Sequence, residues 1–100
     1  MATLTTIFVP SGNGTALSVT THAASLIQTL SKNQIFAINA TEDVTIKFGL
    51  VTVADPTGVE FRIPTGTTAT FDLGDKYDSF KVYNLGTSTA SVYYLPLSHI

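Results

Sequence analysis

Residues 43–48, which read Asp-Val-Thr-Ile-Lys-Phe, decide the fold class of this chain. Apolar and polar side chains alternate along them with a period of two, which is typical of a β-strand with one buried face. We expect Val44, Ile46 and Phe48 to point inward and the intervening Thr45 to point outward. A helix would need apolar residues three and four positions apart, so this stretch predicts a strand.

The same alternation recurs on both sides of this stretch at spacings of about ten residues. The expected strands are 4–9, 16–20, 34–39, 50–54, 59–63, 67–73, 78–84 and 89–95, together with 43–48. Turn residues rich in Pro, Gly and Asp separate many of them, as in 10–14, 55–58 and 64–66. Such spacing suits an all-β fold, either an antiparallel β-sandwich or a small barrel. We expect an antiparallel β-sandwich of jelly-roll type with about eight short strands.

One segment, residues 21–30, is ambiguous, because it fits either a short helix or an irregular strand. We favour extended structure there because the remainder of the chain is β. The expected core comes from the inward positions of the other strands. Its members are Val44, Ile46, Phe48, Phe61, Ile63, Phe71, Phe80 and Val82.

The length of 100 residues predicts a single domain over residues 1–100, in which the first thirty could instead serve as an attachment arm. Only 12% of the residues are charged, about half the usual level, whereas threonine alone accounts for 17 positions. A surface of hydroxyl and methyl groups is weakly protected against association. The composition therefore favours a protein whose surface is covered by neighbouring subunits.

Several classes of partner are unlikely on composition alone. The net charge is −2 and the five basic residues are scattered, which argues against nucleic-acid binding. No apolar run approaches the length of a membrane span, so we expect no membrane contact. The N-terminus has neither a basic nor an apolar region, so we expect no signal peptide.

Catalytic and metal sites are not indicated either. His22 and His99 have no neighbouring residue that would orient them. The cluster Asp72, Asp75 and Asp78 could begin a calcium loop, but Lys76 interrupts it and no glutamate follows at suitable spacing. The chain has no cysteine. We therefore predict no enzymatic activity, no cofactor and no metal.

The apolar excess at the two chain ends is more informative. Residues 4–9 and 93–100 carry large side chains at successive positions, so one of Tyr93 and Tyr94 must point outward from a strand that is covered on one side. Exposed aromatic residues are favoured at interfaces. The expected interface residues are Leu4, Ile7, Phe8, Val9, Tyr83, Tyr93, Tyr94, Leu95, Leu97 and Ile100.

Residues 34–97 also resemble the small β-sandwich structural proteins of tailed bacteriophage virions. The matching features are residues 38–49 (INATEDVTIKFG), 63–66 (IPTG), Phe71, 80–86 (FKVYNLG) and 90–94 (ASVYY). The resemblance implies a cement (decoration) protein on the virion capsid surface that bridges major capsid subunits, as a homo-oligomer and most simply a trimer. The alternatives are a tail or fibre component and a receptor- or carbohydrate-binding module in which Tyr83 or Tyr93 stacks on sugars.

Overall fold

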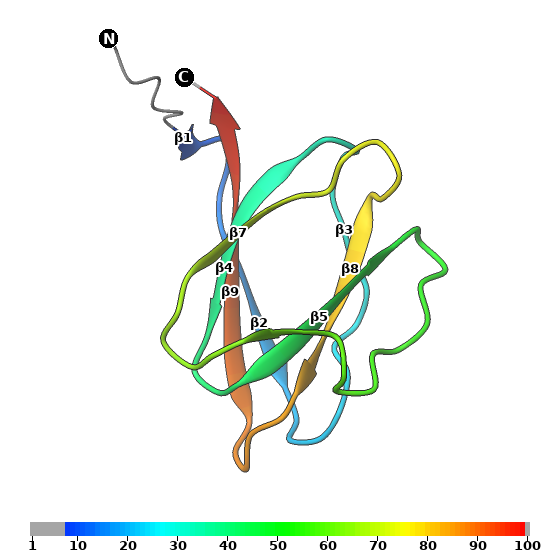
Figure 1. Ribbon diagram of the computed structural model, residues 1–100. Coiled ribbons are helices and arrows are strands. Elements are labelled where there is room, and N and C mark those ends of the chain that lie inside the picture. The colour runs from blue at the N-terminus through cyan, green and yellow to red at the C-terminus, as the bar shows by residue number, and fades with distance from the viewer. Residues whose placement is uncertain (1–7, 100) are drawn as a thin grey trace, which may run out of the picture.

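The computed structural model describes residues 8–99, and within this range the chain forms nine β-strands and no helix (Figure 1). The strands are β1 (Phe8–Pro10), β2 (Thr15–Val19), β3 (Gln28–Thr29), β4 (Ile35–Ala40), β5 (Val44–Gly49), β6 (Phe61–Ile63), β7 (Ala69–Asp72), β8 (Ser79–Asn84) and β9 (Ala90–His99).

The strands form two antiparallel sheets, here called sheet A and sheet B. In sheet A, β9 lies between β4 and the consecutive strands β1 and β2, and β7 completes the sheet beyond β4. Sheet B has the order β3-β8-β5-β6. From β2 to β9 every connection crosses from one sheet to the other, except that between β5 and β6. This is the strand order of a jelly roll, which confirms the expected fold class.

The core lies between the sheets and follows the alternation of the sequence. In β4 every second side chain is buried, which places Phe36 and Ile38 inside. The Phe36 ring stacks on Phe80 of the opposite sheet, with centroids 4.9 Å apart. Of the expected core residues, five are fully buried and two, Phe48 and Phe71, are partly buried. The five are Val44, Ile46, Ile63, Phe80 and Val82.

The remaining expected core residue, Phe61, is a correction, because its side chain is 62% exposed. It belongs to β6, a three-residue strand at the edge of sheet B, where the two sheets open to solvent. Its ring retains an edge contact with Phe71 at 5.5 Å between centroids. Alternation assigns a side chain to a face, but at a sheet edge that face is not covered.

The expected strand over residues 50–54 is also wrong. The chain turns there, with the Val53 N–H donating to the Leu50 carbonyl at 2.8 Å. The loop that follows covers part of the outer face of sheet B, because Thr45 Oγ1 donates to Glu60 Oε1. Thr45 points outward as expected, yet it is 1% exposed beneath this loop.

Residues 21–30 are extended, in agreement with the favoured interpretation. Ala24 forms an isolated bridge with Tyr83, and β3 pairs with β8. Residues 15–29 therefore contribute strands to both sheets. The attachment arm stays a prediction.

Candidate interaction surface

The two ends of the described chain lie together. β1 pairs with the last residues of β9, in the register Phe8 with His99 and Pro10 with Leu97. Figure 1 shows this pair extending beyond the body of the sandwich. Three expected interface residues, Leu4, Ile7 and Ile100, lie outside the described residues. For Phe8 and Val9 the structure describes the backbone pairing of β1.

The two adjacent tyrosines of β9 have opposite roles. Tyr94 is 5% exposed, packs edge-on against Phe80 at 5.1 Å and donates from its hydroxyl to Gln28 Oε1 at 2.8 Å. Tyr94 is therefore a core residue, which corrects its assignment to the interface. Tyr93 is 43% exposed on the outer face of sheet A, as the alternation required of one of the pair.

Neighbouring strands extend the surface around Tyr93. The register pairs Ala16 with Tyr93, Ala37 with Leu95 and Ile35 with Leu97, and paired residues in antiparallel strands share a face. All six are exposed or half-buried. We call this set the apolar face of sheet A. It consists of Ala16, Ile35, Ala37, Tyr93, Leu95 and Leu97. Two polar residues adjoin it on the same side of the sheet: Asn39, which pairs with Tyr93, and Asp72, which pairs with Ile35.

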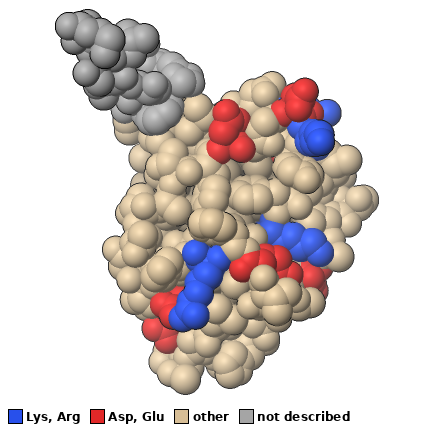
Figure 2. All heavy atoms as spheres, in the orientation of Figure 1, with Lys and Arg blue, Asp and Glu red and all other residues tan. Residues whose placement is uncertain are grey.

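The charge distribution distinguishes this face from the remainder of the surface. All twelve charged residues of the chain lie between Lys32 and Lys81, so β1, β2 and β9 contain none. Within sheet A the single charged residue is Asp72, on the edge strand β7. Figure 2 shows the acidic and basic side chains as small mixed groups separated by uncharged surface.

The ring of Tyr93 packs over Gly14. A Cβ atom at Gly14, in the loop between β1 and β2, would lie 2.0 Å from Tyr93 Oη. The tyrosine therefore lies across the space that a side chain at position 14 would fill. This close approach of the ring to the backbone of Gly14 requires a residue without a side chain at position 14.

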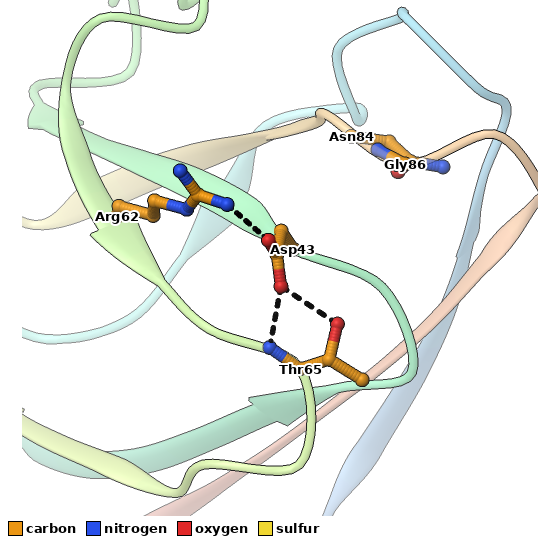
Figure 3. A network of polar contacts seen from close by, with 5 residues as sticks. All are labelled: Asp43, Arg62, Thr65, Asn84 and Gly86. Carbon is orange, nitrogen blue, oxygen red and sulfur yellow. Dashed lines mark hydrogen bonds and ion pairs between the residues drawn. The ribbon is translucent and has the colours of Figure 1, made fainter.

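A polar cluster lies elsewhere, where loops 41–43, 64–66 and 85–87 meet. Asp43 accepts hydrogen bonds from the Arg62 guanidinium, and from the backbone N–H and Oγ1 of Thr65 at 2.7 Å each (Figure 3). The Thr65 N–H and the Arg62 guanidinium lower the pKa of Asp43 to about 2. In the neighbouring loop, the carboxylate of Glu60 accepts hydrogen bonds from the N–H groups of Thr57 and Gly58. These hydrogen bonds lower the pKa of Glu60 to about 2.

The cluster borders a hollow of about 460 Å³. Its lining comprises Glu42, Asp43, Arg62, Thr65, Leu85, Gly86 and Thr87. Each carboxylate there is engaged with loop groups: Asp43 as described, and Glu42 by accepting the Ser88 N–H at 3.1 Å. These contacts hold the loops in place. The Thr65 hydroxyl donates to Asp43, but the lowered pKa of Asp43 makes this carboxylate a weak base.

One polar residue that alternation did not identify is Asn84, which is fully buried. Its Nδ2 donates to the carbonyls of Val19 at 3.0 Å and Ser88 at 2.8 Å, and its Oδ1 accepts the Gly86 N–H at 2.8 Å. Figure 3 shows Asn84 beside Gly86. A single amide thus ties β8 to β2 and to the loop before β9.

The other residues considered from the sequence are not brought together. Asp72 accepts the Gly74 N–H at 2.8 Å and Asp78 accepts from Ser79, as expected of turn residues. Among residues 8–99, no group of three His, Asp or Glu side chains is placed to hold a metal ion. His22 is exposed, and Tyr83 is half-buried on the outer side of sheet B, away from the apolar face of sheet A. No helix of the described chain is long and apolar enough to cross a membrane.

Fold and surface together define a jelly-roll β-sandwich in which one outer face, that of sheet A, is largely apolar and has Asp72 of the edge strand β7 as its single charged residue. No protein-family model matches this chain, and no curated protein matches it significantly in sequence. Among solved structures it is similar to a chain from Bacillus endospore appendages, described as a novel family of disulfide-linked pili. The TM-score is 0.53 at 20% identity, over 97% of this chain and 91% of that one. Identity this low establishes the fold alone.

Proposed function

We propose that this chain is a non-enzymatic structural subunit that binds neighbouring subunits of a larger assembly through the apolar face of sheet A. The observation that carries the proposal is the scarcity of charge on this side of sheet A, where Asp72 on the edge strand β7 is the single charged residue, in a chain whose charged residues all lie between Lys32 and Lys81. Charged residues are depleted from the centres of protein interfaces, where aromatic residues are enriched. A flat apolar area on one side of a small domain usually marks a binding site.

Two kinds of assembly are candidates. The resemblance to bacteriophage β-sandwich proteins supports a cement protein that bridges major capsid subunits on a virion. The similarity to an endospore appendage chain supports a subunit that polymerises with its own kind. This chain contains no cysteine, so in an appendage its contacts would be non-covalent or formed through other groups.

A charge placed on the apolar face tests the proposal. We expect Leu95→Glu to fold normally, because Leu95 is half-buried on the outer side of β9, but to lose association. Leu26→Glu is the matched control, since Leu26 is 84% exposed in the loop between β2 and β3. Circular dichroism measures folding, and sedimentation of the protein alone and with stripped capsids measures assembly.

The outcomes separate the two forms. Filaments of the purified chain in negative-stain electron micrographs would favour the appendage, whereas stoichiometric binding to shells would favour the cement protein. If Leu95→Glu assembles as well as the wild type in both assays, the proposed use of this face is wrong.

A further inference from the structure

The apolar face of sheet A also indicates what binds to it, provided that the proposed structural role holds. We propose that its partner is the same face of a second copy, packed sheet on sheet about a two-fold axis that passes near Tyr93 and Leu95. The pairing would place two sheets about 10 Å apart, as within a β-sandwich. Each face would then cover the other's uncharged surface.

The charge pattern favours a second copy over an unlike partner. A two-fold axis brings the same patch of both copies together, so a charged patch repels itself. The single charged residue of sheet A, Asp72, is on β7, two strands away from β9. With strands about 4.8 Å apart, the two Asp72 residues of a pair would lie about 20 Å from each other, beyond the Debye length of about 8 Å.

Sheet B provides the internal comparison. Its outer side carries Lys47 directly opposite Lys81, and Arg62 on the adjoining strand β6. Lys81 is paired there with Asp55, and Arg62 with Asp43. A two-fold pairing of that side would have to remove these charged groups from water, which is costly. Self-pairing therefore fits sheet A and not sheet B.

The outer side of sheet A as a whole is large enough for a weak, specific contact. Its five strands contain 28 residues. At about 3.3 Å along and 4.8 Å across the strands, they span about 440 Å² in projection. Two such faces give about 900 Å² before side-chain relief and the surrounding loops are added, which approaches the lower limit of about 1,000 Å² for biological interfaces.

Tyr93 is the natural anchor at the centre of this contact. Its ring is already fixed over Gly14, so little side-chain freedom is lost on binding. Tyrosine is among the residues that carry most of the energy at interface centres. Leu95, the next outward residue of β9, lies beside Ala37, so a partner side chain meets no bulky obstacle there.

Sedimentation velocity over a concentration series tests the pairing. We expect the wild type to form a concentration-dependent dimer, and Tyr93→Glu and Leu95→Glu to weaken dimerisation about tenfold or more. The control Leu26→Glu should dimerise as the wild type does. Because the chain has no native cysteine, Leu95→Cys should give a disulfide-linked dimer under mild oxidation, whereas Leu26→Cys should not.

Two results would overturn the inference, and they differ in what they say of the proposed function. A wild type that stays monomeric up to about 1 mM, yet binds shells through the Leu95 surface, would exclude self-pairing and keep the structural role. Dimerisation and shell binding that both survive Tyr93→Glu and Leu95→Glu would exclude the face itself, and with it both proposals.

Discussion

Truncation of Phe61 and of Phe80 to alanine tests whether the stability that each side chain contributes follows its burial in the folded sandwich or its position in the alternating pattern. Both Phe61 and Phe80 were expected in the core, but their side chains are 62% and 0% exposed. Phe80 stacks on Phe36 at 4.9 Å and meets Tyr94 edge-on at 5.1 Å. Phe61 meets Phe71 edge-on at 5.5 Å between ring centroids.

The magnitudes follow from these contacts. Phe→Ala in a core costs about 3–5 kcal/mol, and two aromatic pairs place Phe80→Ala at about 4 kcal/mol. Phe61 is mostly exposed, so Phe61→Ala removes little buried apolar area and one edge contact. We therefore expect it to lower the free energy of unfolding by about 1 kcal/mol. For a domain of this size the corresponding falls in melting temperature are about 20 °C and about 5 °C.

Urea unfolding followed by far-UV circular dichroism measures the two free energies on one scale. Equal m-values in both variants would show that the unfolded reference has not changed. Because the wild type has a total stability of about 5–15 kcal/mol, Phe80→Ala could approach complete unfolding, and Phe80→Leu then provides a milder step at the same site. A Phe61→Ala cost equal to or above that of Phe80→Ala would refute this reasoning, since it would require β6 to be covered.

The other predictions concern polar groups. The lowered pKa values of Asp43 and Glu60 mean that the folded state binds fewer protons, so their stabilisation is present above about pH 4.5 and is lost as the pH falls through about 2. The melting temperature should fall over this range, and less steeply in an Asp43→Asn, Glu60→Gln variant; an equal fall would contradict the assignment. Asn84→Ala should cost about 3 kcal/mol in urea unfolding because it leaves three backbone groups without their partner, and a cost below about 0.5 kcal/mol would show that water replaces the amide. Chelator should leave the melting temperature unchanged, whereas a calcium-dependent rise of several degrees would point to metal binding by loop 72–78.

The burial of Tyr94 in the folded chain changes which tyrosine should be mutated to test the interface. The sequence alone placed Tyr94 at the interface, where Tyr94→Ser would be expected to impair assembly, but Tyr94 is 5% exposed and packs against Phe80. That substitution would destabilise the fold and obscure any effect on association. Tyr93, its neighbour, is the informative position.

The alternating pattern by itself determined the strands with a well-covered face. β4, β5 and β8 were predicted almost to the residue, because a one-residue shift would turn every apolar side chain of a central strand toward solvent. Local pattern also determined the turn behaviour of the Asp72 and Asp78 loop, since Asp bonds to nearby backbone groups.

Tertiary structure alone decided what covers each face. Phe61 and Phe80 have the same chemistry, yet Phe61 is on the edge strand β6 and Phe80 is on β8, a central strand of the same sheet. Thr45 is buried by a loop whose course depends on Glu60, fifteen residues away. The apolar face of sheet A likewise joins β2, β4 and β9, which are distant in sequence, because pairing between strands is set by the whole sandwich and not by neighbours along the chain.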